Sequence, residues 1–225
     1  MTSRPTEKPK ALEARRYAML DTLLHRFGTI NTAEQVADYL TEHEATRAEV
    51  AQLAEALDDR ISLAHDTYPV PDWPLALHRH YESREILAAI GRATAGQKNP
   101  CVVRGIFKVP DTQQELLLVT LDKSSGNFSP TTRYLDYAIS PSRFRWETPS
   151  NATVTRDSGR RYIESPANGC SFYLFVRTDN QSPYAFLGPV RYVSHEGDRP
   201  IQIEWQLETP MPARLFDRYA TLTPG

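Results

Sequence analysis

Cysteine is scarce in this sequence, which contains only Cys101 and Cys170 among 225 residues. The two are far apart and form no C-x-x-C pair, which excludes a disulfide framework and a cysteine-based zinc site. Both lie in apolar, strand-like sequence, so we expect buried free thiols. Only His78 and His80 of the six histidines are close together, and no cysteine or carboxylate stands at ligand spacing from them. We therefore expect no metal and no cofactor.

Long apolar runs are also lacking. No stretch of about eighteen apolar residues is present, so we expect no membrane span. The N-terminal segment is polar and has no apolar signal core, which together with the scarce cysteine predicts a cytoplasmic protein in a reducing environment. The formal net charge is −2, without the positive balance of many nucleic-acid-binding proteins. A surface that binds nucleic acid would therefore have to be a local patch.

The sequence lacks common catalytic signatures. It has no G-x-S-x-G elbow, no glycine-rich phosphate loop and no H-E-x-x-H motif. Ten glycines leave little scope for close backbone approach to a nucleotide phosphate. Asp136 has no partner carboxylate nearby in sequence for acid–base catalysis, and neither cysteine has an adjacent base. These absences favour a protein that recognises a ligand, and we do not expect an enzyme.

The first third of the chain has a helical pattern. Apolar residues recur at helical spacing over residues 12–64, and Thr32 with Gln35 three residues later has the spacing of a capping box. Three prolines in TYPVPDWP then predict a stiff linker. A further helix is expected to begin with Ser83 as its N-cap and to end near Gly91.

The remainder of the chain has a strand pattern. Short runs rich in β-branched and aromatic residues, separated by turn residues, occur at 101–108, 114–122, 135–140, 143–147, 170–178, 184–194 and 201–208. Several short strands after a block of helices predict an α+β protein whose second part is a curled sheet or barrel. We expect a helical region over residues 1–74, whose first ten or so residues form a disordered lead, and a β-rich domain over residues 75–225.

The segment from Ser129 to Trp146 holds the most suggestive chemistry. It combines four aromatic residues, one acid and three arginines, which are Tyr134, Tyr137, Phe144, Trp146, Asp136, Arg133, Arg143 and Arg145. Aromatic rings, a carboxylate and guanidinium groups are what a protein uses to stack a base, hydrogen-bond its edge and hold its phosphates. Because tyrosine and tryptophan also favour strands, the same composition is typical of a half-buried strand pair.

Strand alternation divides this segment between two faces. Tyr134, Asp136 and Ala138 fall on one face, and Tyr137 falls on the other with its apolar neighbours. An acid on the core side of a sheet needs a partner. The exocyclic amine of a cytosine is one suitable partner. Arg177 or a backbone N–H would serve equally well.

A basic patch follows from the same region. Residues 128–161 contain six arginines against three acids and no lysine, the arginines being Arg133, Arg143, Arg145, Arg156, Arg160 and Arg161. Arginine is suited to forked contacts with phosphates and to stacking on bases, so these residues are candidates for contacts with a DNA backbone. A solvated strand face paired with acids elsewhere would explain them as well. Residues 147–161, rich in Ser, Thr and Asn, are predicted to form a mobile loop.

Five ordered motifs resemble one known family. They are Y-x-S-R-E-I-L at residues 81–87, S-P-x-T-x-Y-x-D-Y-x-I-S at 129–140, F-x-W at 144–146, L-F-V-R at 174–177 and F-L-G-P-V-x-Y-V-S-H-E-G at 186–197. The family is a C-terminal domain, long of unknown function, that follows helicase modules. It occurs in type IV restriction enzymes that couple a phospholipase-D-like nuclease to a helicase.

This resemblance implies a β-barrel-like fold similar to SRA and PUA-type domains. Such domains bind double-stranded DNA that carries 5-methylcytosine or a related base, and they take the flipped base into an aromatic pocket. The signature motif includes four candidate pocket residues, which are Tyr134, Asp136, Tyr137 and Trp146. The expected function is therefore recognition of modified cytosine without cleavage by this chain, with a separate nuclease or helicase as a further partner.

Two other functions remain compatible with the sequence. The domain could be a docking module for a nuclease or helicase subunit of a restriction system, in which case DNA binding would be absent. It could also recognise an RNA base with a similar fold, in which case it would prefer single strands and sense the 2′-hydroxyl.

Overall fold

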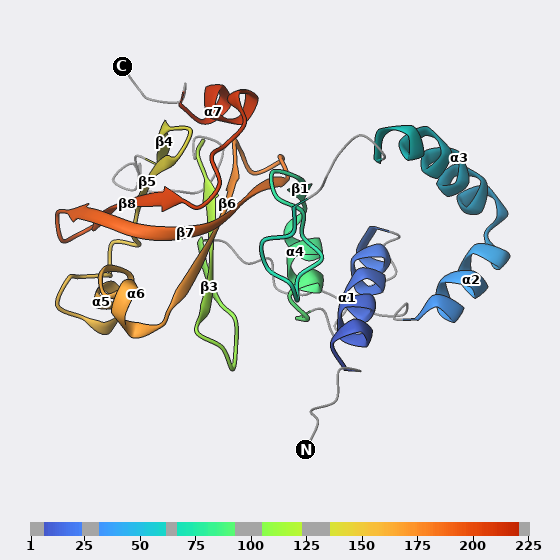
Figure 1. Cartoon of the computed structure of the whole chain (residues 1–225), viewed down its shortest axis with the longest axis horizontal. Helices are drawn as coiled ribbons and strands as arrows, with labels where there is room; N and C mark the ends of the chain where they lie inside the picture. The colour runs from blue at the N-terminus through green and yellow to red at the C-terminus, as the bar shows by residue number, and fades with distance from the viewer. Residues whose placement is uncertain (1–6, 24–31, 62–66, 93–104, 123–135, 221–225) are drawn as a thin grey trace. The chain divides into compact units, whose positions relative to one another are not determined.

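The structure is a computed structural model that describes residues 7–23, 32–61, 67–92, 105–122 and 136–220. Its contacts divide the chain into two units. The first unit comprises Met1–Leu77 and Tyr81–Val102, and the second comprises His78–His80 and Val103–Gly225. The helices of the first unit and the sheet of the second are drawn in Figure 1.

The first unit is helical, as the sequence pattern predicts. Its described helices are α1 (Glu7–Leu23), α2 (Ala33–Glu42), α3 (Glu44–Ile61) and α4 (Ser83–Ala89). The hydroxyl of Thr32 accepts a hydrogen bond from the backbone N–H of Gln35 at 3.2 Å and caps α2 as expected. The N-cap of α4 is Glu82 and not Ser83, because Glu82 and Glu85 exchange side-chain and backbone hydrogen bonds in a reciprocal capping box.

Burial differs between these helices. Residues 86–89 of α4 and its C-cap residue Ile90 are buried, and α1 packs against this helix. No residue of α2 is buried, and Leu53 of α3 is 61% exposed. The apolar stripe of α4 therefore forms a packing face, whereas those of α2 and α3 remain accessible in the described part of the chain.

The second unit contains the sheet. Its strands are β1 (His80–Tyr81), β2 (Gly105–Lys108), β3 (Gln114–Thr120), β4 (Tyr137–Ser140), β5 (Arg143–Glu147), β6 (Ser171–Arg177), β7 (Tyr184–Glu196) and β8 (Gln202–Leu207). The strand order is β2-β3-β6-β7-β8-β5-β4, and β1 pairs with β7. The α+β class is confirmed. The sheet is open, because no described pairing joins its edge strands β2 and β4 into the barrel that the sequence suggested.

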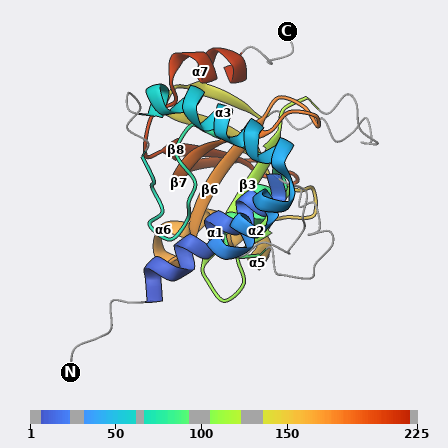
Figure 2. The same cartoon turned by 90° about the vertical axis from the view of Figure 1, so that its right-hand side faces the viewer.

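The centre of the sheet is the most apolar part. Residues 172–177 of β6 and 115–119 of β3 are buried, as expected for strands covered on both faces. These two strands pair in parallel, with Leu117 opposite Leu174, and every other pair along the strand order is antiparallel. Figure 2 shows β3, β6, β7 and β8 side by side. The long strands therefore form the rigid centre to which β5 and β4 are added.

A β-bulge allows β7 to pair with two neighbouring strands. The register between β6 and β7 shifts beside Leu174, whose partner is Gly188. Gly188 has a φ of +91°, which a residue with a Cβ adopts only with strain. Residues 185–190 of β7 pair with β6, and residues 190–196 pair with β8. The bulge thus allows a 13-residue strand to bend from one partner to the next.

Three helices accompany the sheet. They are α5 (Asp157–Ile163), α6 (Ser165–Asn168) and α7 (Ala213–Ala220). The prediction of a mobile loop over residues 147–161 is wrong for its last five residues, which belong to α5. Tyr162 of this helix is buried in the core, and the backbone N–H of Val154 donates to Asp198 at 2.8 Å. Core burial and this bond fix the segment, although its polar composition resembles that of a loop.

Gly159 marks a close approach inside this segment. A Cβ at this position would overlap the backbone carbonyl of Thr153 and would lie 2.7 Å from Cδ1 of Ile201. We therefore expect Gly159→Ala to lower the free energy of unfolding by about 1–3 kcal/mol through overpacking. Urea denaturation followed by circular dichroism measures the change. Ser158→Ala, at an exposed position of the same helix, is the matched control, and equal stability of the two variants would contradict the tight contact.

Candidate functional site

Strands β4, β5, β8 and β7 carry polar side chains on the surface of the sheet that faces away from the core. Strand pairing sets Tyr137 opposite Arg145, Arg145 opposite Glu204, and Glu204 opposite Ser194. We call this surface the polar face; its residues are Tyr137, Ile139, Arg143, Arg145, Glu147, Arg191, Ser194, Glu196, Gln202, Glu204 and Gln206. Side chains from four strands, distant in sequence, thus form one surface.

The polar face contains a hollow. It is lined by Ile139 of β4, Arg145 of β5, residues 194–196 of β7 and residues 202–204 of β8. Ile139 is 42% exposed and gives the hollow one accessible apolar side chain. The hollow therefore combines an accessible apolar group with hydrogen-bond donors and acceptors, which is the composition of a small-ligand or base-edge site.

Ion pairs and amide contacts organise these polar groups. A guanidinium nitrogen of Arg143 lies 2.7 Å from Oε1 of Glu204. Arg145 donates to Oε1 of Gln202, and one of its nitrogens lies 3.5 Å from Glu196. Nε2 of the same Gln202 amide donates to Oε1 of Glu147 at 2.8 Å. The charges of Arg143 and Arg145 are thus balanced by acids on the same surface.

One donor of Arg145 stays unused. Its Nε is buried and has no hydrogen-bond partner among the described residues. A buried donor of a charged group without a partner is costly to the folded state. On the same strand as His195, Tyr192 packs against the hydrophobic core, and its hydroxyl lies 2.6 Å from Nδ1 of His195. Burial raises the pKa of Tyr192, so the hydroxyl remains protonated and can hold the imidazole in place.

Asp136 lies on the core side of the sheet. It is 8% exposed, and its Oδ1 accepts a hydrogen bond from the backbone N–H of Glu147 at 2.8 Å. The expected alternation is confirmed over residues 136–139, because Asp136 and Ala138 are buried while Tyr137 and Ile139 are more accessible. The backbone partner that the sequence left open is therefore present, and Asp136 fastens the start of β4 to β5.

Trp146 lies in the hydrophobic core and is 5% exposed. Its ring meets Tyr162 edge-on with centroids 5.2 Å apart, and Trp205 at 6.4 Å. Phe172 completes the aromatic cluster between Tyr162 and Trp205. Trp146 and Asp136 thus face the core, whereas Tyr137 belongs to the polar face. The structure does not bring these three candidates together, and Tyr134 and Arg133 lie outside the described residues.

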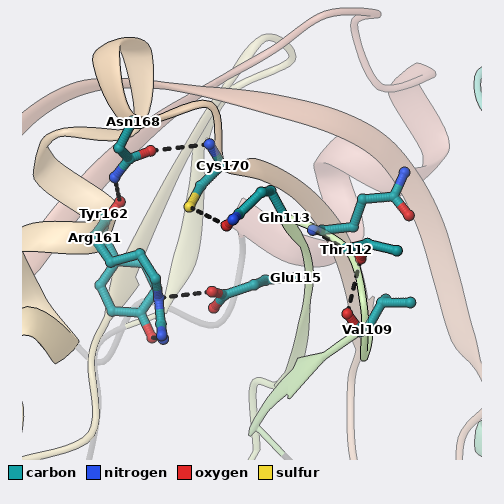
Figure 3. A network of polar contacts seen from close by, with 9 residues as sticks. Val109, Thr112, Gln113, Glu115, Arg161, Tyr162, Asn168 and Cys170 are labelled. Carbon is teal, nitrogen blue, oxygen red and sulfur yellow. Dashed lines mark hydrogen bonds and ion pairs between the residues drawn. The ribbon is translucent and has the colours of Figure 1, made fainter.

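The other candidate arginines occupy different surroundings. Arg156 is the exposed N-cap of α5, and Arg160 pairs with Glu164 four residues later at 2.9 Å. Arg161 lies 2.6 Å from Glu115 of β3, whose side chain is only 5% exposed. Figure 3 shows the Arg161 guanidinium facing this carboxylate, beside the ring of Tyr162. Arg161 therefore serves a buried ion pair, and the arginines of this stretch do not form one basic surface.

Cys170 lies beside this ion pair. The thiol is free and half-buried, and it donates to the Gln113 side chain at 3.6 Å. Burial raises the pKa of the Cys170 thiol, so it stays protonated at neutral pH and is a poor nucleophile. The other cysteine, Cys101, lies outside the described residues.

The described residues contain neither a cluster of metal ligands nor a helix that could span a membrane. No three His, Cys, Asp or Glu side chains among them gather closely enough to hold a metal ion. Within the same part of the chain, no helix has the length and apolar character that crossing a bilayer requires.

Sequence reasoning missed the residues that line most of the hollow. Gln202, Glu204 and Gln206 alternate with buried residues along β8, so their common face was visible in the sequence as a period of two. His195 and Glu196 lie at the end of β7, and only the strand pairing shows that they meet β8. A sequence pattern that could identify these residues was therefore present in β8 and absent in β7.

Together, the fold and the polar face define an α+β protein with an open sheet that presents a small hollow lined by polar side chains and Ile139. The chain belongs to the family described as "Domain of unknown function (DUF3427)", whose model matches residues 75–219. This range includes α4, all eight strands and most of α7. No curated protein matches the chain.

Proposed function

We propose that the β-rich unit binds double-stranded DNA and recognises 5-methylcytosine or a related modified cytosine turned out of the helix. The motif resemblance to domains of modification-dependent restriction enzymes with SRA- or PUA-like folds supports this function. The hollow of the polar face is the structural feature on which it rests. The unit is proposed to recognise and not to catalyse, and a nuclease or helicase on another chain would carry out cleavage.

The side chains of the hollow suit a cytosine edge. A glutamate accepts from the N4 amine of cytosine, and Glu204 lines the hollow. The second N–H of the Gln202 amide adds a donor for the ring nitrogen or the carbonyl of cytosine, because only one N–H is needed for the bond to Glu147. Glu204 replaces Asp136 as the proposed partner of the exocyclic amine, because Asp136 is buried on the core side of the sheet and accepts from the backbone N–H of Glu147 at the end of β5.

Ile139 offers an explanation for the preference for a modified base. An exposed aliphatic group beside polar edge-binding groups can contact a substituent at carbon 5 of the pyrimidine. Tyr137 stands directly opposite Arg145 and can provide a stacking surface. Tyr134 and Arg133 precede β4 in the chain and remain predicted contacts to the base and the backbone.

A binding panel tests this function. We expect the full chain to bind a methylated duplex more tightly than an otherwise identical unmethylated duplex by about fourfold or more, because one buried methyl group contributes roughly 0.8 kcal/mol. Ile139→Ala should remove this preference while leaving binding to the unmethylated duplex nearly unchanged. Fluorescence anisotropy with oligonucleotides that differ only in one cytosine modification measures both quantities.

Val193→Ala is the matched control for this variant. Val193 is also an exposed aliphatic residue of the same sheet, at 37%, but it does not line the hollow. Its replacement should leave the preference intact. Equal binding of all cytosine forms by the unaltered chain would refute recognition of modified cytosine, and tighter binding to single-stranded RNA would favour an RNA-base reader.

One observation favours a docking module as a second function. Arg143 and Arg145 are already paired with Glu204 and Glu196, so they are less available to phosphates than free arginines would be. A balanced polar surface with one exposed isoleucine is also typical of the rim of a protein interface. Phosphate contacts make DNA affinity fall steeply with salt. Absence of salt-dependent DNA binding, with capture of a nuclease or helicase subunit, would support docking.

A further inference from the structure

The orientation of the Gln202 amide in the hollow is fixed by its two neighbours. Its oxygen accepts from a guanidinium nitrogen of Arg145, and its Nε2 donates to Oε1 of Glu147 at 2.8 Å. Arginine has only donors and a carboxylate has only acceptors, so a reversed amide would face both neighbours with the wrong group. Glu147 is 7% exposed, so water has little access to relieve such a mismatch. The amide therefore has one favourable orientation.

Both neighbours of Gln202 are themselves held in place. Strand pairing sets Glu147 directly opposite Gln202, and the backbone N–H of Glu147 donates to Asp136 at 2.8 Å. A guanidinium nitrogen of Arg145 also lies 3.5 Å from the carboxylate of Glu196. These contacts come from paired strands, which position side chains more precisely than loops do. The amide orientation is thus a property of the sheet.

Glu204 gives the hollow a hydrogen-bond acceptor. Its Oε1 lies 2.7 Å from an Arg143 nitrogen, and the hydroxyl of Ser194 donates to its Oε2 at 3.5 Å. A carboxylate has about four lone-pair positions, so Glu204 can accept a further hydrogen bond. Gln202 and Glu204 both line the hollow and lie two residues apart on β8, on the same face of the sheet. One strand thus presents a donor and an acceptor to the same ligand.

This donor–acceptor pair distinguishes two classes of pyrimidine. Cytosine has an amine donor at N4 next to the acceptor N3, whereas thymine and uracil have a carbonyl acceptor at O4 next to a donor N3–H. With cytosine, the amine donates to Glu204 and N3 accepts from the second N–H of Gln202. Thymine or uracil in the same place would set its carbonyl against the carboxylate and its N3–H against the amide N–H. Both contacts would then be mismatched.

We infer that Gln202 is a specificity-determining residue through which the hollow accepts cytosines and rejects thymine and uracil. Arg145 and Glu147 are the positioning residues that hold its amide. The ligand class therefore excludes uracil and thymine, the products of deamination of cytosine and 5-methylcytosine. The inference rests on the proposed function, but it concerns the hydrogen-bonding edge of the base and not the substituent at carbon 5 that Ile139 is proposed to contact.

Four duplexes that differ in one base test the inference. The base is cytosine, 5-methylcytosine, uracil or thymine, and it stands opposite an abasic site so that no base pair has to be broken. Because 5-methylcytosine and thymine carry the same methyl group, the ratio of their affinities reports the edge alone. We expect the unaltered full chain to prefer 5-methylcytosine to thymine, and cytosine to uracil, by about tenfold or more. Fluorescence anisotropy measures these affinities.

Gln202→Glu replaces the amide donor by an acceptor and should abolish or reverse both preferences. Gln206→Glu is the matched control, because Gln206 lies on the same strand and face but does not line the hollow. It adds the same charge and should keep both preferences. Equal preferences in these two variants would overturn the role of Gln202. Gln202→Met, which adds no charge beside Glu147, repeats the test if circular dichroism shows that Gln202→Glu is unfolded.

Glu147→Gln tests the positioning role. A glutamine at this position can face Gln202 with either its oxygen or its nitrogen, so the amide of Gln202 is then held only by Arg145. Both preferences should fall, but by less than in Gln202→Glu. Unchanged preferences in Glu147→Gln would overturn the positioning role of Glu147.

The same four duplexes separate this inference from the proposed function. Tighter binding of 5-methylcytosine than of cytosine, with equal binding of 5-methylcytosine and thymine, would overturn the inference and keep recognition of the methyl group. Tighter binding of cytosine than of uracil, with equal binding of cytosine and 5-methylcytosine, would support the role of Gln202 and refute recognition of modified cytosine. Failure to bind any of the four would overturn both.

Discussion

Replacing Trp146 with alanine is expected to lower the free energy of unfolding by about 3–5 kcal/mol, a large fraction of the stability of a typical domain. The indole is 5% exposed and contacts Tyr162 and Trp205, so its removal leaves a cavity that the surrounding rigid strands cannot fill. Urea denaturation of the full chain, followed by tryptophan fluorescence and far-ultraviolet circular dichroism, measures the loss.

Tyr137→Ala is the informative comparison for Trp146. Tyr137 lies on the adjacent strand but on the polar face, where it is only half-buried. The Tyr137→Ala replacement should therefore lower the free energy of unfolding less than Trp146→Ala does. It should lower the DNA affinity more. If Trp146→Ala instead kept its stability and lost selectivity for modified cytosine, Trp146 would be a wall of the base pocket and its place in the core would be contradicted.

Arg161→Met is expected to destabilise the protein by about 3–5 kcal/mol at neutral pH, because it leaves the buried carboxylate of Glu115 without its partner. The Glu115 side chain is 5% exposed, and the Arg161 nitrogen lies 2.6 Å from it. Lys108, the strand partner of Glu115, also acts on this carboxylate but is exposed. Methionine keeps most of the side-chain volume, so the effect isolates the charge.

The destabilisation should shrink in acid. Burial raises the pKa of Glu115, while Arg161 and Lys108 pull it down in part. Without Arg161 the pKa rises further. A carboxyl group whose pKa is raised in the folded state stabilises the folded protein fully at pH values below the pKa of the unfolded state. This contribution is lost as the pH rises through the pKa of the folded state. Unfolding curves from neutral pH down through the usual glutamate range therefore test the pair.

Arg160→Met is the matched control for this pH series. Arg160 is the neighbouring residue, and its ion pair with Glu164 is exposed on both sides. Exposed pairs contribute about 0–1 kcal/mol, so this variant should remain close to the unaltered protein at every pH. A loss in Arg161→Met that is the same in acid as at neutral pH would show that packing, and not charge, explains it.

Local patterning predicts much of the sheet from the sequence. The run over residues 143–147 coincides with β5, and five other predicted runs each contain one strand, because β-branched and aromatic residues are bounded there by turn residues. The run over residues 184–194 begins with β7 but ends two residues before that strand does. The two-residue strand β1 was missed, since it depends on pairing with β7 and has no pattern of its own. The short helices α5 and α7 were missed for a related reason, because their stability comes from buried Tyr162 and Tyr219.

The candidate site was less predictable than the fold. Alternation correctly separated Asp136 from Tyr137, since it depends only on neighbours in the chain. The position of Arg145 opposite Glu204 depends on the pairing of β5 with β8, and no local sequence pattern predicts that pairing. The density of arginines over residues 128–161 suggested one basic surface, but glutamates of distant strands pair with three of them, and Arg160 pairs with Glu164 four residues later. Long-range pairing therefore decides which charges are available.

The parallel pairing of β3 with β6 has a consequence for the order of folding. Thr120 and Arg177 are partners in this pair and stand 57 residues apart, so the chain must close a long loop before the two strands can join. The strands β6, β7 and β8 are consecutive and antiparallel, with much shorter loops between them. We expect this three-stranded meander to form first and the addition of β3 and β5 to limit the folding rate.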